Sequence, residues 1–167
     1  MSVNSIALGL LFGAIFVALV AWAIYSDMNR LTIPNWITMA LIANFYAYAM
    51  IVANDVPIWE HSILAFTVFV AGVALFLLNW FGGGDVKFLA AVVLWAGPTG
   101  VVPLLLIMSL AGLVLGIAIL CARAVLAKLP SPKVLQNLIP GWVSSGPCPY
   151  GVAIGLAALI VVPGRIF

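Results

Sequence analysis

Two aspartates are the residues whose type and placement could do chemistry. Asp27 lies in the segment YSDMNRLTIPNW, and Asp85 lies in NWFGGGDVKF. Both border long apolar stretches, where a carboxylate is costly and therefore indicates a functional site. Two carboxyl groups at one membrane depth can activate water, because the ionised group accepts a proton while the protonated group donates one. The pair therefore predicts hydrolysis without a metal ion, a cofactor or a covalent intermediate.

The residues just before Asp85 are three glycines: Gly82, Gly83 and Gly84. Glycine removes the side chain that would keep an extended substrate backbone away, and it permits unusual dihedral angles. A flexible turn between two helices would also explain the glycines. An N-cap for a helix beginning at Val86 would equally explain Asp85. Lys87 either marks the membrane interface or tunes the charge of Asp85.

The residues after Asp27 also have simpler interpretations. Arg30 follows one helical turn later and could form an interfacial ion pair with Asp27. Pro34 suits the first position of a helix, with Asn35 beside it. For Asp27 alone, an ordinary interfacial carboxylate would be the more economical interpretation. Its pairing with Asp85 shifts the balance toward catalysis.

The elements that position these residues must lie in a bilayer. Of the 167 residues 66% are apolar and 6% are charged, against about 45–50% and 25% in soluble domains. The net charge of +2 comes from too few groups to indicate nucleic acid as a partner. Cys121 and Cys148 show neither a disulfide framework nor a zinc-binding spacing. The composition predicts one all-α integral membrane domain over residues 1–167.

Four apolar stretches reach the roughly 17 to 20 residues that a spanning helix needs. They are 6–25, 36–53, 62–80 and 101–121. Two further stretches, 86–96 and 150–162, are shorter. Hydropathy by itself therefore leaves the number of spans between four and six.

The distribution of charge favours six spans. If all six stretches cross, Arg30, Lys87, Arg123, Lys128 and Lys133 share one side, and the other side holds Asp55, Glu60, His61 and Arg165. This arrangement satisfies the positive-inside rule, with both termini outside and both aspartates at the cytoplasmic level. His61 is then expected to be an interfacial polar residue. The segment from Val134 to Trp142 is suited to lying in the interface.

The stretch 86–96 would reach only about 17 Å as a helix, against a hydrocarbon core of about 30 Å. Either the glycine segment is drawn below the cytoplasmic surface or the bilayer thins there. Both possibilities place Asp85 near a sunken polar cavity.

With these features, the sequence resembles the type IV prepilin peptidases, a group of GxGD intramembrane aspartic proteases. The first part of the match is Asp27, Arg30, Ile33, Pro34 and Asn35. The second is Gly82, Gly83, Gly84, Asp85 and the following Lys87. The layout of six spans and the late Pro149, Tyr150, Gly151 step also agree with that family.

The resemblance implies a prepilin or pseudopilin substrate with a short basic leader and a hydrophobic helix. Cleavage would follow a glycine at the cytoplasmic face of a bacterial inner membrane. Many members carry a cytoplasmic region with paired CxxC motifs and a methyltransferase activity, and this sequence lacks both. The compact form resembles the peptidases of Flp-type (tight adherence) pilins. Neither the pilin nor the oligomeric state follows from the sequence.

Helix ends suggest roles for the two carboxyl groups. A helix N-terminus favours the charged form of Asp85, which would be the base. A helix C-terminus favours the neutral form of Asp27, which would be the acid. Two alternatives stay open. A proton-coupled transporter or channel could use the same carboxylates. A protease like signal peptide peptidase is the other, although the IPN context argues against it.

Overall fold

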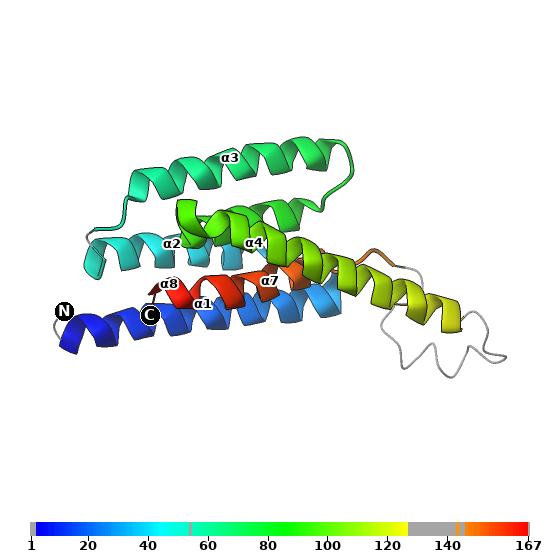
Figure 1. The fold of residues 1–167 in the computed structure, drawn as a ribbon, viewed down its shortest axis with the longest axis horizontal. Coiled ribbons are helices and arrows are strands. Elements are labelled where there is room, and N and C mark those ends of the chain that lie inside the picture. The colour runs from blue at the N-terminus through cyan, green and yellow to red at the C-terminus, as the bar shows by residue number, and fades with distance from the viewer. Residues whose placement is uncertain (1–2, 54, 127–142, 144–145, 167) are drawn as a thin grey trace.

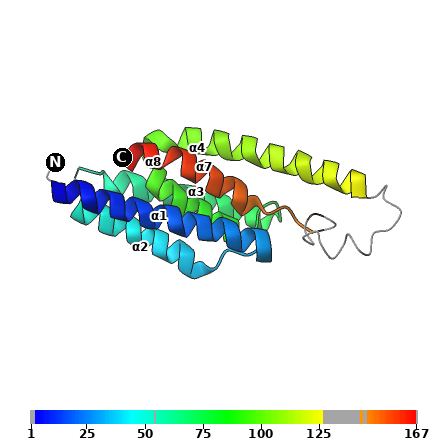
Figure 2. The same cartoon turned by 90° about the horizontal axis from the view of Figure 1, so that it is seen from below.

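The computed structural model describes residues 3–53, 55–126, 143 and 146–166, and every element in this part of the chain is helical (Figures 1 and 2). The helices are α1 (Val3–Arg30), α2 (Asn35–Ile51), α3 (Ile58–Leu77), α4 (Gly83–Leu126), α7 (Tyr150–Val161) and α8 (Pro163–Ile166). The predicted all-α class is confirmed for these residues.

The α4 element consists of two helices joined at Gly97. This residue has φ 66° and ψ −176°, which is not a helical conformation. Positive φ suits glycine, and Pro98 then fits the start of a new helix, because its fixed φ is compatible with the first turn. A Cβ atom at position 97 would also overlap the ring of His61. The break falls in the predicted gap between 86–96 and 101–121.

The first half of α4 runs antiparallel to α3. Near the start of α4, Val86 fills the space where a side chain at Gly72 would lie. Near its end, the Leu94 carbonyl oxygen lies 2.8 Å from His61 Nδ1. The chain therefore reverses at Gly97 and returns along the second half of α4, which brings both termini to one end of the molecule (Figure 1).

His61 is more deeply involved in packing than its predicted interfacial position suggests. Its ring stacks on Phe45 at a centroid distance of 5.4 Å, and its side chain is half-buried. Because His61 touches both Leu94 and Gly97, it holds α3 against the reversal in α4.

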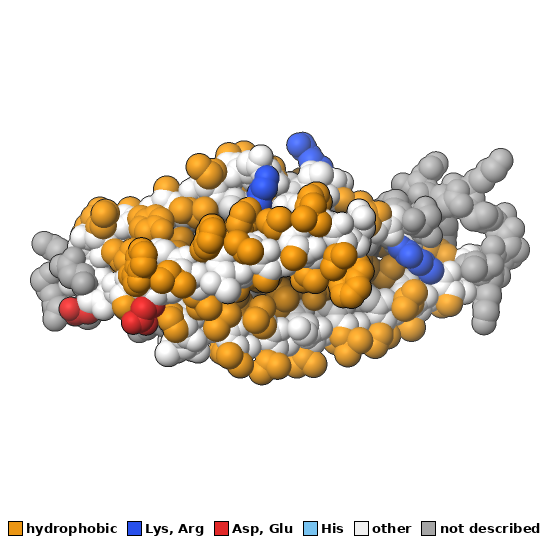
Figure 3. All heavy atoms as spheres, turned by 90° about the horizontal axis from the view of Figure 1, so that it is seen from above, with side chains coloured by type: hydrophobic (Ala, Val, Ile, Leu, Met, Phe, Trp, Pro, Cys, Tyr) orange, Lys and Arg blue, Asp and Glu red, His pale blue; other side chains and the backbone are white. Residues whose placement is uncertain are grey.

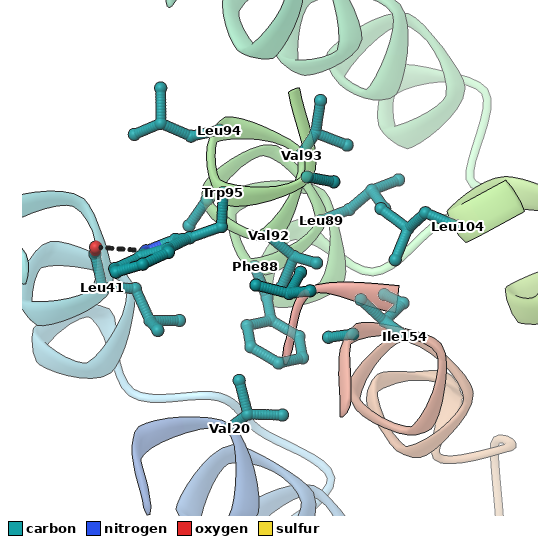
Figure 4. Packing of buried hydrophobic residues seen from close by; sticks show 14 of the residues in the cluster. Val20, Leu41, Phe88, Leu89, Val92, Val93, Leu94, Trp95, Leu104 and Ile154 are labelled. Atoms are coloured by element: carbon teal, nitrogen blue, oxygen red, sulfur yellow. Dashed lines mark hydrogen bonds between the residues drawn. The ribbon is translucent and has the colours of Figure 1, made fainter. Parts of the chain in front are cut away.

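The centre of the bundle is the first half of α4, which is buried on nearly all sides. Its buried residues are Val86, Phe88, Leu89, Ala91, Val92, Val93, Leu94, Trp95 and Ala96. Figure 4 shows six of them, Phe88, Leu89, Val92, Val93, Leu94 and Trp95, among Val20 of α1, Leu41 of α2 and Ile154 of α7. The only polar atom that a Trp side chain offers is its N–H group, and Trp95 donates it to the Leu41 carbonyl at 2.9 Å. A helix that is apolar all round is expected at such a central position.

Three of the described helices are long and apolar enough to cross a membrane: Ser5–Arg30 within α1, Ile58–Leu77 and Gly83–Leu126. The chain is thus a helical membrane protein. The sequence predicted a fourth full-length stretch at 36–53, but α2 ends at Ile51 after 17 residues. α7 is shorter still, at 12 residues.

Two predicted boundaries were wrong. α3 begins at Ile58, directly after Pro57, and ends at Leu77. It therefore begins four residues before the predicted start at position 62. Asn79 ends this run with φ 59°, a left-handed conformation typical of helix C-termini. The helix that carries Asp85 begins at Gly83 and not at Val86.

Charged side chains are segregated along the bundle. Asp55 lies in the connection between α2 and α3, and Glu60 lies in the first turn of α3. These two exposed acidic residues are at the same end as the termini (Figure 3), whereas Asp27 and Asp85 are at the other end. Three of the four described basic residues, Arg30, Lys87 and Arg123, lie away from that end, whereas Arg165 lies in α8 near the C-terminus. The predicted interfacial segment from 134 to 142 lies outside the described residues, as do Lys128 and Lys133.

Replacing Gly97 by alanine should destabilise the fold. Gly97→Ala places a Cβ atom on a residue with positive φ and against the His61 ring, so we expect a loss of about 1–3 kcal/mol in unfolding free energy. A lower thermal midpoint in detergent micelles would report it. Gly116→Ala is the matched control, because no atom lies within 4 Å of its Cβ position. Equal midpoints for the two variants would contradict this account of the break.

Candidate active site

Asp27 and Asp85 line one cavity of about 770 Å³. It lies where α1 and α3 end and where α2, α4 and α7 begin, so five helix ends supply its wall. The other lining residues are Leu31, Thr32, Ile33, Asn35, Asn79, Trp80, Phe81, Gly82, Gly83, Gly84, Lys87, Pro147, Cys148 and Tyr150. The fold therefore brings together two carboxyl groups that are 58 positions apart in sequence (85 − 27).

Asp27 is in the last turn of α1 and is only 4% exposed. Its carboxyl group faces the backbone N–H groups of Gly151 and Val152 at the start of α7. Its Oδ2 atom is buried and has no hydrogen-bond partner in the described part of the chain. A buried polar atom of this kind is uncommon, and functional sites are one of its recognised causes. Asp27 is therefore held by α7 while one oxygen remains available.

Asp85 is half-buried in the first turn of α4, so it is not the N-cap that the sequence suggested. Its Oδ2 atom lies 2.7 Å from the position that a Cβ atom at Gly82 would occupy. Gly82 thus leaves room for the carboxyl group to fold back over the start of the helix. Asp85 and Asp27 are close enough to interact electrostatically.

The three glycines before Asp85 do not use the positive φ angles that glycine permits. Among the described residues, positive φ occurs at Leu31 (52°), Asn79 (59°) and Gly97. Leu31 and Asn79 both line the cavity and end α1 and α3, and the Leu31 N–H donates to the Asp27 carbonyl at 2.9 Å. Left-handed residues commonly end helices. The unusual conformations thus lie at the helix ends that border the cavity.

Gly84 lies beside the connection between α1 and α2. A Cβ atom at this position would lie 3.5 Å from the backbone N of Ile33, which is an ordinary van der Waals distance. The start of α4 therefore contacts this connection, but the contact does not require glycine. The close approach of a substrate backbone to the glycines stays a prediction.

The other predicted site residues divide into two groups. Lys87 and Asn35 line the cavity, and Lys87 Nζ donates to Asn35 Oδ1 at 3.2 Å. This bond joins the start of α4 to the start of α2. Pro34 is the residue before α2 and not its first residue, and Arg30 is exposed and does not line the cavity.

Four residues of this site were not predicted as functional: Ile33, Cys148, Tyr150 and Gly151. A Cβ atom on Gly151 would lie 2.8 Å from both Asp27 Oδ2 and Ile33 Cδ1, so its absence lets α7 approach Asp27. The Pro149, Tyr150, Gly151 sequence was the available signal, but spacing alone did not connect it with Asp27. Cys148 carried no signal of its own.

A family comparison identifies the class of protein. The model of the type IV leader peptidase family matches residues 14–117, which is more than half of the chain. The chain belongs to the type IV leader peptidase family. The matched region contains both aspartates and the glycine segment, whereas α7 lies beyond it. No curated protein and no solved structure matches the sequence.

As a leader peptidase, the protein acts on prepilin substrates in a lipid environment. A membrane-embedded peptidase needs a polar recess in which water and a peptide bond can meet. Irregular backbone at membrane depth must likewise be covered by protein or water. The cavity at the end of α1 is such a recess, and it holds two carboxyl groups.

Adding a side chain at Gly151 should impair the peptidase by moving Asp27. In Gly151→Ala, the new Cβ atom displaces the Asp27 carboxyl group or pushes α7 outward. A displacement of about 1 Å at a catalytic group costs on the order of 100-fold in rate. We expect a loss of about 10- to 100-fold in prepilin cleavage by purified enzyme in detergent.

Gly164→Ala is the control for that variant, because nothing lies within 4 Å of its Cβ position. It should cleave at the wild-type rate. If Gly151→Ala is equally active, the contact between α7 and Asp27 has no bearing on catalysis.

The thiol of Cys148 should react slowly at neutral pH. Partial burial, and then the negative charge of Asp27, raise the pKa of Cys148 above its ordinary value, although Arg123 opposes them. A raised pKa leaves less thiolate, which is the reactive form. In a Cys121→Ser background, iodoacetamide should alkylate Cys148 with a pH midpoint above that of glutathione. Asp27→Asn should lower this midpoint, and an unchanged midpoint would argue against their interaction.

Proposed function

We propose that this leader peptidase is an intramembrane aspartic endopeptidase in which Asp27 and Asp85 activate the hydrolytic water. The observation that carries the proposal is their presence in one cavity of about 770 Å³, within reach of each other's charge. Two carboxyl groups that share one proton supply the acid and the base for attack on a peptide carbonyl. Like charges so placed resist double ionisation, which keeps one proton on the pair.

Other catalytic groups in the cavity fit hydrolysis less well. Cys148 is a potential nucleophile, but its raised pKa keeps the thiol protonated. A cysteine peptidase also needs a base beside the thiol. The only histidine of the sequence is His61, which packs against Gly97 at the reversal of α4, far along the bundle from Asp85. The carboxyl pair is therefore the best-supported catalyst.

The assignment of acid and base from helix ends needs revision. Asp85 lies in the first turn of α4, as expected for a carboxylate stabilised by the helix dipole. Asp27 ends α1 but also faces the first N–H groups of α7. Both carboxyl groups thus receive stabilisation from a helix N-terminus, and the dipole argument does not distinguish them. The proposal therefore assigns the shared proton to the pair.

We propose six membrane crossings with both termini in the periplasm and the cavity facing the cytoplasm. Three observations support this topology. The two halves of α4 run in opposite directions, the termini share one end (Figure 1), and three of the four described basic residues, all but Arg165, lie away from that end. In a bacterial inner membrane, the positive-inside rule then places the cavity on the cytoplasmic side.

The proposed substrates are Flp-type prepilins, cleaved at the junction between a short basic leader and a hydrophobic helix. The sequence contains two cysteines and no CxxC motif, so the paired CxxC region of the larger peptidases has no counterpart in it. N-methylation of the product is accordingly left out of the proposed activity. The family match also favours cleavage over the proton-coupled transport that the same carboxylates could serve.

Replacing either aspartate should abolish most of the activity. Asp27→Asn and Asp85→Asn each remove one member of the acid–base pair while keeping the side-chain shape. Since general acid–base catalysis contributes about 100- to 10,000-fold, we expect a loss of at least about 100-fold in leader cleavage. The measurement is the rate of prepilin processing by purified enzyme in liposomes.

Asp55→Asn is the matched control, since this exposed aspartate lies in the α2–α3 connection at the other end of the bundle. It should process prepilin normally. Wild-type rates in either cavity variant would refute the carboxyl pair, and loss of activity in all three would point to a general effect of charge on folding.

A further inference from the structure

A second hollow lies on the flank of the bundle beside the cavity. It has a volume of about 520 Å³ and lies between α2 and α3, with the first half of α4 as its floor. We call it the flank groove. Its lining residues are Asn35, Thr38, Met39, Ile42, Tyr46, Ser62, Ala65, Phe66, Phe69, Lys87, Ala90, Ala91 and Leu94. Nothing in the proposed chemistry uses it.

The flank groove adjoins the catalytic cavity. Asn35 and Lys87 line both hollows, and the hydrogen bond between them lies at the junction. At the far end, the Tyr46 hydroxyl and Ser62 Oγ lie 3.0 Å apart and join α2 to α3. Along α2 the groove extends from Asn35 to Tyr46, which is about 16 Å at 1.5 Å per residue. It can therefore contact two to three turns of a helix.

The lining suits a helix better than any polar ligand. The floor is formed by small side chains, Ala65, Ala90 and Ala91, which allow another helix backbone to approach closely. Large side chains form the rim, where Met39 and Phe66 are each 67% exposed. Helices associate in lipid through surfaces of this kind, in which small residues form the floor and adaptable large side chains form the rim.

We propose that the flank groove binds the apolar helix of the prepilin substrate while the leader junction occupies the cavity. This inference rests on the proposed function, because that function requires a substrate in which the cleavage site directly precedes an apolar helix. Such a chain, leaving the cavity past Asn35 and Lys87, enters the groove at once. A lipid acyl chain could fill the same volume, but a lipid would occupy the groove whether or not the groove adjoined the cavity.

Two variants alter the groove without touching the carboxyl pair. Ala90→Leu fills the floor, and Phe66→Ala removes an exposed part of the rim. Ala71→Leu is the matched control, because Ala71 lies on α3, is exposed and does not line the groove. Phe66→Ala remains decisive if Ala90→Leu fails to fold, since an exposed ring contributes little to the core.

The experiment compares two substrates in the same detergent. One is a complete prepilin, and the other is a short peptide that spans the leader junction and lacks the apolar helix. We expect the ratio of kcat/KM for prepilin to kcat/KM for the peptide to fall about 10-fold in Ala90→Leu and Phe66→Ala. The fall should come mainly from a higher KM for prepilin, because docking contributes equally to ground and transition states. Ala71→Leu should keep the wild-type ratio.

An unchanged ratio in both groove variants would overturn the inference, even if the enzyme cleaves prepilin normally. If wild-type enzyme cleaves neither substrate, the proposed function fails and the docking site with it. These two failures are therefore distinguishable.

Photo-cross-linking separates a peptide occupant from a lipid. The photoreactive residue p-benzoylphenylalanine replaces Phe66 in an Asp27→Asn enzyme, which should hold prepilin without turnover. Irradiation in liposomes with prepilin should label the apolar helix of the substrate, whereas the same probe at Ala71 should label lipid. Labelling of lipid alone at position 66 would overturn the inference.

Discussion

The burial of the first half of α4 is the constraint on which the rest of the structure depends. This segment is surrounded by α1, α2, α3, α7 and the second half of its own element, so its apolar side chains contact protein on nearly every side (Figure 4). A helix in that position cannot move without disturbing the whole bundle. Asp85, in its first turn, is consequently placed by the packing of the core rather than by a loop.

Glycines make the close approaches around this central helix possible. Gly72 admits Val86, and Gly151 lets α7 meet Asp27. In a bilayer the helices gain little from excluding lipid, so tight van der Waals contact and interhelical hydrogen bonds provide most of their association. The bond from Trp95 to the Leu41 carbonyl is one such contact. The cavity that holds the two carboxyl groups forms where this close packing stops, at the helix ends.

The helix ends also define the electrostatics of the cavity. Asp27 is at the C-terminus of one helix and faces the N-terminus of another, while Asp85 begins a helix of its own. The N-terminal N–H groups of a helix favour negative charge, so the bundle offers two places where a carboxylate is tolerated at depth. Lys87, which might have neutralised Asp85, instead bonds to Asn35. The carboxyl pair is left facing the cavity without a described cationic partner.

The sequence by itself determined the solvent of this protein, its helical class and the two aspartates. Composition alone requires a bilayer, and a bilayer restricts the backbone to helices or closed barrels because unpaired N–H and C=O groups are too costly there. The sequence also predicted separate stretches at 86–96 and 101–121, and the reversal at Gly97 falls between them. Local chemistry decides each of these features.

Only the tertiary structure decided which helix ends meet around the two aspartates. Gly151 contacts Asp27, and Cys148 lines the same cavity as Asp27, although both are more than 100 positions from Asp27 in sequence. Local sequence pattern does not show which residues so far apart come together. The same reason explains why the sequence left open whether Arg30 and Lys87 interact with the aspartates. Their neighbours in sequence are the aspartates, but Arg30 points to the exterior and Lys87 to Asn35. Pairing is a property of packed helices, and packing is settled by the whole bundle.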